Sequence, residues 1–369
     1  MCYKGGFEVI INLQHPREMK NIMKNKGLFL TICCLLVGAF LAAGLYHFEG
    51  GTSPSSPSLP RLTGHRQGIQ LSQEGSPVIF RDALSELDHQ APLGNATKIS
   101  FSTPSHLKII NPSSHRALKR LFAQSNYSWK TLNQGVPPLV LESLPPDLDR
   151  ISQLNKRKKM FFLSLLPMVL LVNGEIHRER EDLLSLFNDY DQGGSLAKNR
   201  RQQVASLARE YRVKGDPLTD QAARQKLLRR VDIIPPSIVL AQAATESAYG
   251  TSRFAQDGNN LFGEWTFIVG TGLVPKKRPA GATYEVRRFD SLYDSVKSYM
   301  WNINIHRAYR PFREERAHRR AEDRPLNGIE LARGLKRYSI RKEDYVQDIR
   351  SIIRQNDLSY LASVSLRNS

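Results

Sequence analysis

The stretch that decides the fold is "AQAATESAYGTSRFAQDGNNLFGEW", residues 241–265. It begins with small and apolar residues that are interrupted by a single carboxylate, Glu246. Pro236 before this stretch and Gly250 within it are typical of a helix start and a helix stop. We therefore expect one helix over residues 236–249.

Glu246 lies on this predicted helix among residues that cannot neutralise it. By the three- and four-residue spacing it shares a face with Val239, Gln242 and Ala243. Burial and the negative end of the helix dipole both disfavour the ionised form, so both raise the pKa. A carboxylic acid that stays protonated near neutral pH can donate a proton to a glycosidic oxygen. An ordinary ion pair, for instance with Arg253, is the alternative.

The segment "DGNNLFGEWTF", residues 257–267, is predicted to form a tight loop because its glycines permit turns. Asn259 and Asn260 offer side-chain amides, and Phe262, Trp265 and Phe267 add aromatic surface. Sugar recognition uses this combination of flat apolar faces and groups that bind hydroxyls. The alternative is that the aromatic residues belong to an ordinary core.

Together these motifs resemble the signature of bacterial peptidoglycan glucosaminidases, glycoside hydrolase family 73. In that family a helix ending in Glu-Ser-aromatic-Gly is followed by Asn-Leu-Phe-Gly. The similarity covers roughly residues 140–360 and includes "FFLSLLPMVLLVN" and "YSIRKEDYVQDIRSII". It implies a mainly α, lysozyme-like glucosaminidase fold in which a small β-hairpin forms one lip of a cleft. It also implies cleavage of the β-1,4 bond after N-acetylglucosamine in peptidoglycan, with Glu246 at the position of the general acid.

The resemblance places a second acidic residue in the β-hairpin, which we expect within residues 268–291. Between Trp265 and Tyr284 the chain contains no Asp or Glu. Glu285 and Glu264 are therefore the candidates for the second carboxylate. The acetamide of the substrate itself is a further possible nucleophile.

The remaining candidate site residues are contacts to the glycan. They lie in the motif or match aromatic positions of the family's terminal helical region: Gln242, Tyr249, Asn259, Asn260, Phe262, Trp265, Tyr338 and Tyr345. For Tyr338 and Tyr345, core packing is the competing interpretation. The histidines show no close ligand spacing, and neither a phosphate-binding glycine loop nor a nucleophile elbow is present. We therefore expect no metal and no cofactor.

The N-terminal region carries a membrane signal. Residues 28–48 form about twenty uncharged residues, enough for a helix to cross a bilayer. Lysines precede this stretch and Glu49 follows it, so residues 1–27 are expected in the cytoplasm and the rest of the chain outside it. This predicts a single-pass inner-membrane protein whose catalytic domain lies in the periplasm of a Gram-negative bacterium. A cleaved signal peptide is the alternative, with secretion to the periplasm.

The rest of the chain divides by composition. A Ser- and Pro-rich stretch over residues 49–137 predicts a flexible stalk, residues 138–360 the glucosaminidase-like domain, and residues 361–369 a C-terminal tail. The apolar run from 160 to 172 is too short to span a membrane and contains Pro167, so we expect a buried helix with a kink. Helical spacing also marks residues 201–213, 221–232 and 345–355.

The formal net charge of +18 predicts attraction to anionic material. An exported domain rarely meets nucleic acid, so we expect peptidoglycan strands, and the inner membrane through the N-terminal helix, as partners. The leading hypothesis is a β-N-acetylglucosaminidase that hydrolyses peptidoglycan. A lytic transglycosylase on the same fold and a wall-binding protein without turnover are the alternatives. The sequence leaves the oligomeric state open.

Overall fold

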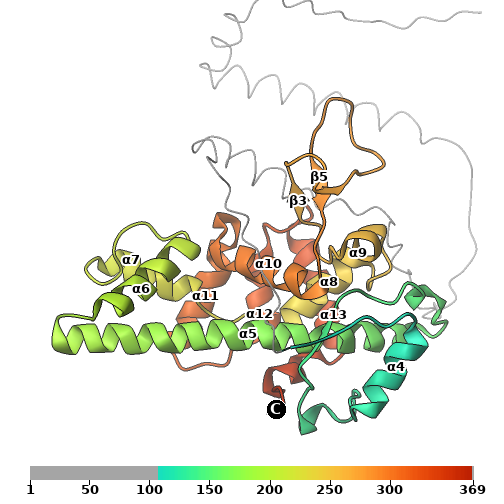
Figure 1. Ribbon diagram of the computed structural model, residues 1–369, viewed down its shortest axis with the longest axis horizontal. Coiled ribbons are helices and arrows are strands. Elements are labelled where there is room, and N and C mark those ends of the chain that lie inside the picture. Colours follow the sequence, from blue (N-terminus) through green and yellow to red (C-terminus); the bar gives the residue numbers. More distant parts are fainter. Residues whose placement is uncertain (1–106, 368–369) are drawn as a thin grey trace, which may run out of the picture. The chain divides into compact units, whose positions relative to one another are not determined.

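The computed structural model describes residues 107–367, in which helices carry two small β-sheets (Figure 1). The α-helices are α4 (His115–Gln124), α5 (Leu154–Gly193), α6 (Lys198–Glu210), α7 (Gln221–Arg230), α8 (Pro236–Ser247), α9 (Arg253–Gly258), α10 (Leu292–Ile305), α11 (Arg310–Ala321), α12 (Gly328–Leu331) and α13 (Glu343–Gln355). The 3₁₀ turns are η1 (Leu132–Gln134), η2 (Leu148–Arg150), η3 (Arg307–Tyr309), η4 (Ala332–Leu335) and η5 (Leu358–Ser363). The strands are β1 (Lys108–Ile110), β2 (Leu139–Leu141), β3 (Trp265–Thr266), β4 (Gly272–Leu273) and β5 (Glu285–Arg287). The predicted mainly helical fold with a small hairpin is confirmed, and the predicted membrane segment, residues 28–48, lies outside the described residues.

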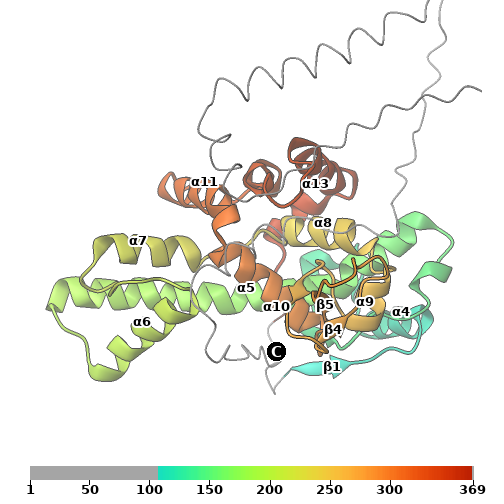
Figure 2. The same cartoon turned by 90° about the horizontal axis from the view of Figure 1, so that it is seen from above.

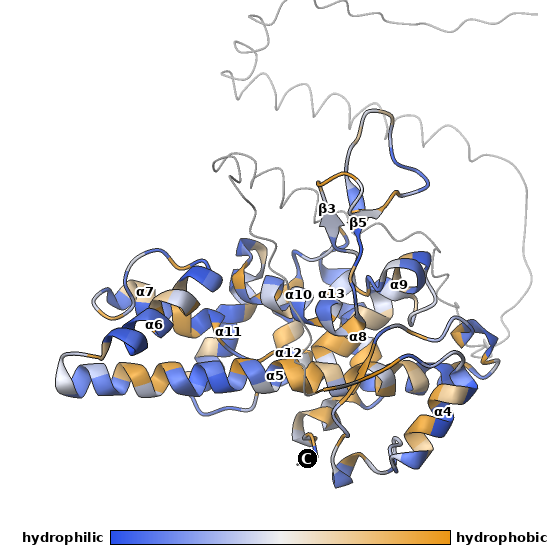
Figure 3. Ribbon diagram, in the orientation of Figure 1, coloured by the Kyte–Doolittle hydropathy of each residue, from blue (hydrophilic) through white to orange (hydrophobic). Residues whose placement is uncertain are grey.

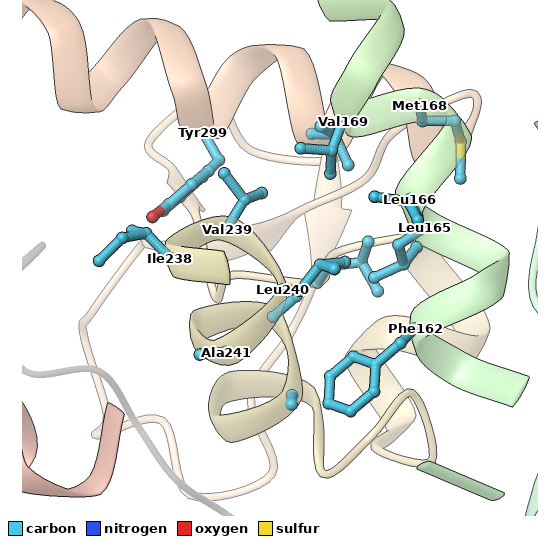
Figure 4. Close-up of a cluster of buried hydrophobic side chains, with 14 of the residues drawn as sticks. Phe162, Leu165, Leu166, Met168, Val169, Ile238, Val239, Leu240, Ala241 and Tyr299 are labelled. Atoms are coloured by element: carbon cyan, nitrogen blue, oxygen red, sulfur yellow. The ribbon is translucent and has the colours of Figure 1, made fainter. Parts of the chain in front are cut away.

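The longest helix, α5, forms one side of the main core. Its residues from Phe161 to Val169 are buried without interruption, which explains the unbroken apolar run in the sequence. Within residues 107–367 it is the one helix long and apolar enough to cross a membrane, yet 72% of its apolar window is buried in the protein. The prediction of a buried helix here is confirmed. Figure 4 shows how its side chains meet those of α8.

Pro167 lies inside α5, which continues on both sides of it. Because proline has no backbone N–H, the carbonyl of Leu163, four residues earlier, loses its donor within the helix. The hydroxyl of Tyr127 donates to this carbonyl over 3.0 Å in the buried core. A side chain distant in sequence thus satisfies the group that the proline leaves unpaired.

The segment that supplies Tyr127 corrects the predicted extent of the stalk. Residues 107–137 do not behave as a stalk: β1 pairs in parallel with β2, and α4 buries Leu118 and Phe122 in the main core. The hydroxyl of Ser114 caps α4 by accepting from the N–H of Ala117. The apolar residues of this segment are too sparse to mark a domain by composition, but most of them lie on a buried face.

The predicted C-terminal tail also belongs to the fold. Leu366 forms a parallel bridge with Val136, and the guanidinium of Arg367 donates to three carbonyls within residues 125–135 over 2.6 to 3.0 Å. These contacts join the two ends of the described chain. The boundary expected at residue 361 is therefore wrong for residues 361–367.

Helix α8 lies inside the main core, where it packs against α5, α13, α12 and η5. Its residues from Pro236 to Ala244 are all buried. The helix ends two residues before the predicted position, and Ala248, Tyr249 and Gly250 follow with φ of 50°, 56° and 78°. A Cβ on Gly250 would lie 2.4 Å from a side-chain carbon of Leu144, so both the backbone angle and the close packing require glycine.

A second hydrophobic core lies between the far half of α5 and the helices α6 and α7 (Figure 2). It includes Leu183, Phe187, Leu207 and Leu227. The helices predicted from apolar spacing at 201–213 and 221–232 correspond to α6 and α7, and the third corresponds to α13.

The predicted hairpin region forms a sheet in the order β3-β5-β4, with both pairs antiparallel. Trp265 pairs with Val286, and Leu273 pairs with the same residue from the other side. The sheet and its loops project from the helices beside α9 and α10 (Figures 1 and 2).

A close approach of η4 to α11 generates a stability prediction. A Cβ on Gly334 would lie 2.3 Å from the Cα of Phe312, so the alanine variant must separate the two elements. We expect Gly334→Ala to lower the free energy of unfolding by about 1 to 3 kcal/mol in chemical denaturation. The matched control is Gly193→Ala, whose Cβ would meet nothing within 4 Å. Equal stability of the two variants would contradict the packing.

Candidate active site

Glu246 occupies the last turn of α8 and retains part of its accessible surface, although protein atoms surround its carboxyl group on most sides. Burial raises its pKa to about 7, and a hydrogen bond from the hydroxyl of Tyr345, 2.9 Å from Oε1, acts in the opposite direction. The C-terminal end of the helix dipole also disfavours the anion. The carboxyl group is therefore protonated in a large fraction of molecules at neutral pH, in a residue that keeps part of its accessible surface. The predicted ion pair with Arg253 is absent, since the guanidinium of that residue donates to the carbonyl of Val274.

A directed chain of buried hydrogen bonds ends at Glu246. The hydroxyl of Tyr299 donates to Oε1 of Gln242, and Nε2 of Gln242 donates to the hydroxyl of Tyr345 over 2.8 Å. Because this amide N–H occupies the oxygen of Tyr345, the tyrosine proton is free to point toward Glu246. Oε1 of Glu246 thus acts as the acceptor, which leaves Oε2 as the oxygen that carries the proton.

Two aromatic stacks hold this chain in place. The ring of Tyr338 stacks on Tyr345 with centroids 5.3 Å apart, and the ring of Phe262 stacks on Tyr299 at 3.9 Å. The hydroxyl of Tyr338 also donates to the carbonyl of Phe262 over 2.9 Å. The chain segments around α8, α10 and α13 are therefore tied together next to the carboxyl group.

These contacts change the roles predicted for four residues. Gln242, Phe262, Tyr338 and Tyr345 are almost completely buried. They support Glu246 from inside the core and do not present a surface to a glycan, so core packing is the interpretation that the structure favours for them.

Glu264 is a second buried carboxyl group, located directly before β3. Its Oε2 accepts from the hydroxyl of Ser298 over 2.7 Å and lies 3.8 Å from the guanidinium of Arg287, whereas Oε1 is buried without a hydrogen-bond partner. Burial raises its pKa to about 7, and Arg287 and Ser298 partly oppose this shift. An unpaired buried carboxyl oxygen is unusual and needs an explanation, such as a role in chemistry or an unseen partner.

Two buried tyrosines, Tyr299 and Tyr309, interact electrostatically with both carboxyl groups. Burial is the main reason why the pKa of Tyr299 and of Tyr309 is raised, and the charges of both Glu246 and Glu264 raise it further. Both carboxyl groups therefore lie within electrostatic range of this tyrosine pair. The sequence contains no signal that marks Ser298, Tyr299 or Tyr309, because they lie in stretches with no recognisable motif.

Glu285, the other candidate for the second carboxylate, is engaged in holding the hairpin. Its carboxylate accepts from the backbone N–H of Gly270 over 3.0 Å and from that of Gly272 over 2.8 Å. These hydrogen bonds lower its pKa. A carboxylate fixed in this way braces the loop between β3 and β4, so Glu285 is the less suitable of the two candidates.

The two asparagines of the motif shape the loop that carries Glu264. Nδ2 of Asn260 donates to the carbonyls of Glu264 and Arg287, both at 2.8 Å, and its Oδ1 accepts from the N–H of Glu264. Asn259 ends α9 with φ of 53° and donates to the carbonyl of Phe289. Their side chains thus replace backbone pairing in the loop, although Oδ1 of Asn259 has no partner.

Of the remaining candidates, Trp265 has features of a ligand contact. Its ring lies 4.3 Å from that of Tyr284, and its indole N–H is buried without a partner. Tyr249 instead packs edge-on against Phe161 and Phe162. Over residues 107–367, no group of His, Cys, Asp and Glu side chains could hold a metal ion.

The hydrogen bond between Tyr345 and Glu246 predicts the direction of a pKa change. Removing the hydroxyl in Tyr345→Phe removes a donor that favours the anion, so the pKa of Glu246 should rise above about 7. The measurement is the side-chain carbon chemical shift of labelled glutamate in an NMR titration. Tyr338→Phe is the matched control, because its hydroxyl donates to a carbonyl and not to the carboxyl group. Similar titrations of wild type and Tyr345→Phe would contradict the hydrogen-bond chain.

The raised pKa of Glu264 predicts a pH dependence of stability. In the unfolded chain this carboxyl ionises near pH 4.5 and in the folded chain near pH 7, so folding holds its proton. Its contribution to the free energy of unfolding is present below pH 4.5 and falls by up to about 3 kcal/mol as pH rises through 7. In Glu264→Gln this part of the pH dependence should vanish in urea denaturation between pH 5 and 8. The variant Asp257→Asn, at an exposed carboxylate, should keep the wild-type profile. Glu246 also contributes to the pH dependence in this range, so the result that would contradict the assignment is a profile of Glu264→Gln that is unchanged from wild type.

Comparison with known proteins identifies the family of the chain. The family model described as Glucosaminidase, mannosyl-glycoprotein endo-beta-N-acetylglucosaminidase, matches residues 221–358, which include Glu246, Glu264 and Tyr345. Protein bax of Escherichia coli (strain K12) is 34% identical over 203 residues, which cover 54% of this chain and 70% of that protein. No solved structure matches the chain. The chain is thus a Bax-like protein that belongs to the glucosaminidase family.

Proposed function

We propose that this protein is a peptidoglycan hydrolase that cleaves the glycan strand after N-acetylglucosamine, as an endo-β-N-acetylglucosaminidase. The observation that carries the proposal is the state of Glu246. Its carboxyl group has a pKa of about 7 and is held by a directed hydrogen bond, and the residue as a whole keeps part of its accessible surface at the end of α8. A general acid for glycoside cleavage needs these three properties.

In the proposed reaction, Glu246 donates its proton to the leaving glycosidic oxygen as the bond to the anomeric carbon breaks. The anomeric carbon then takes a new oxygen, either from water or from the substrate's own acetamide. Glu264 is the better supported candidate for activating water, since its Oε1 lacks a partner whereas both carboxylate oxygens of Glu285 accept from backbone N–H groups. Trp265 offers an aromatic face and an unpaired N–H beside it.

The proposed substrate is the peptidoglycan strand, in agreement with membership of the glucosaminidase family. The net charge of +18 favours binding to an anionic wall polymer. We further propose that the protein is held at the inner membrane by residues 28–48 and acts in the periplasm, because that stretch has the length and flanking charges of an anchor.

A lytic transglycosylase is the second candidate, and one observation favours it. That reaction requires a single acid and no activated water, and Glu264 is 6% exposed, which restricts its contact with water. The two reactions differ in their products, because hydrolysis leaves a reducing end and transglycosylation leaves an anhydro sugar.

The test is digestion of purified peptidoglycan by the full chain, with mass analysis of the fragments. We expect wild type to release fragments with N-acetylglucosamine reducing ends and Glu246→Gln to lower the rate by about 10² to 10⁴. Asp257→Asn, an exposed carboxylate on α9, is the matched control and should keep wild-type activity. Circular dichroism establishes that each variant is folded.

Each result of this digestion has one interpretation. Undiminished cleavage by Glu246→Gln would remove Glu246 from the mechanism. Anhydro ends would assign the transglycosylase reaction, and a folded wild-type protein that binds peptidoglycan without releasing fragments would support a wall-binding role. If Glu246→Gln is inactive, loss of hydrolysis in Glu264→Gln with retention in Glu285→Gln would identify the second carboxylate.

A further inference from the structure

The loops of the β3-β5-β4 sheet expose large apolar side chains. Phe267, Ile268 and Val269 follow β3 and are 52%, 62% and 70% exposed, and Val274 follows β4 and is 48% exposed. Figure 3 shows hydrophobic stretches in these loops, which project from the helices. We call these four residues the apolar tip. Single exposed apolar residues are common, but a group of four within eight positions marks an interaction surface.

The strand register brings the apolar tip together at one end of the sheet. Thr266 pairs with Glu285, and Leu273 pairs with Val286. Because both outer strands run antiparallel to β5, each of them leaves the sheet at the end where β5 begins, so Phe267 and Val274 leave at the same end with β5 between them. The carboxylate of Glu285 binds the N–H groups of the loop between them. These hydrogen bonds hold the loop in the conformation that leaves the apolar tip exposed.

The charged side chains within residues 265–284 are all basic. Lys276, Lys277 and Arg278 come after Val274 and Pro275, and this stretch contains no Asp or Glu, while the carboxylate of Glu285 next to it is held by the N–H groups of Gly270 and Gly272. The guanidinium of Arg278 donates to the carbonyl of Tyr284 over 3.2 Å, which holds this side chain at the base of the loop. Apolar groups that enter the acyl boundary, next to cations that remain at the phosphates, form the pattern that binds anionic bilayers.

Two other occupants fit these residues less well. Sugar recognition requires side-chain donors and acceptors beside aromatic faces, and residues 267–269 carry no polar side-chain group. A symmetric contact between two copies through the tip would bring the basic residues 276–278 of both chains together, where like charges repel. An anionic lipid surface satisfies both the apolar and the basic residues.

We propose that the hairpin tip is a membrane-docking element that inserts Phe267, Ile268 and Val269 into the surface of an anionic phospholipid bilayer. It acts separately from the anchor expected at residues 28–48. Because Glu264 precedes β3 directly, docking holds the candidate active site close to the bilayer. The proposal concerns a binding surface and is independent of the reaction that the protein catalyses.

The test uses the full chain with a tryptophan reporter in the apolar tip, Ile268→Trp. The matched control is Ile340→Trp, because Ile340 is also 62% exposed and lies outside the hairpin. Emission is measured with vesicles of phosphatidylcholine alone or with equal parts of phosphatidylglycerol, with bromine on the acyl chains as a quencher, and the wild-type signal is subtracted. We expect quenching of the Ile268 reporter with phosphatidylglycerol and none of the Ile340 reporter. Adding Lys276→Gln and Lys277→Gln should weaken this binding by about fivefold per charge.

Three results would overturn the proposal. The first is an Ile268 reporter that phosphatidylglycerol vesicles quench no more than phosphatidylcholine vesicles do. The second is an emission change caused by purified peptidoglycan without lipid, which would assign the tip to glycan binding. The third is a change that depends on protein concentration without lipid, which would indicate contact between copies. Any anchor at residues 28–48 is shared by both reporters, so it does not affect their difference.

Discussion

The burial of α8 on nearly every side is the constraint on which the rest of the structure depends. Nine consecutive residues from Pro236 to Ala244 are buried, because α5, α12, α13 and η5 surround the helix. Its alanines allow this close approach. The helix must also end before its last turn reaches the surface, and three left-handed residues after Ser247 end it there. Glu246 consequently lies at the boundary between core and solvent, where its proton is retained and is still accessible.

The tyrosines around α8 connect this packing to the chemistry. Tyr299, Tyr345 and Tyr338 use their rings to fill the core and their hydroxyls to satisfy buried polar groups. Each hydroxyl donates in one direction, so the chain of hydrogen bonds that ends at Glu246 has a fixed polarity. Tyr299 and Tyr309 lie within electrostatic range of both Glu246 and Glu264. The tyrosines therefore fill the core of this region, and the hydroxyl of Tyr345 also affects the proton affinity of Glu246.

The two carboxyl groups of the hairpin region, those of Glu285 and Glu264, have different surroundings. Glu285 is committed to the backbone of the loop, which keeps the sheet closed and the apolar tip exposed. Glu264, at the base of the sheet, keeps one oxygen unpaired. The resemblance to the family places a reacting acid in the hairpin, whereas Glu285 accepts hydrogen bonds from the backbone of the hairpin loop. We propose Glu264, in the loop before β3, as the second carboxyl group.

The sequence by itself determined the helical class, the bounds of α8 within two residues and the buried nature of α5. It also marked the exceptional position of Glu246. These features follow from local periodicity, from the positions of proline and glycine, and from the short motif. It did not show that residues 107–137 and 361–367 belong to the fold, since sparse apolar residues and a single arginine gain meaning only when distant segments meet them. It also predicted Gln242 and Phe262 as glycan contacts and Glu285 as a candidate second carboxylate. Only the tertiary structure showed what surrounds these side chains, because burial and hydrogen-bond partners depend on which elements pack together, and no local pattern specifies the partner of a side chain that lies 50 or more residues away.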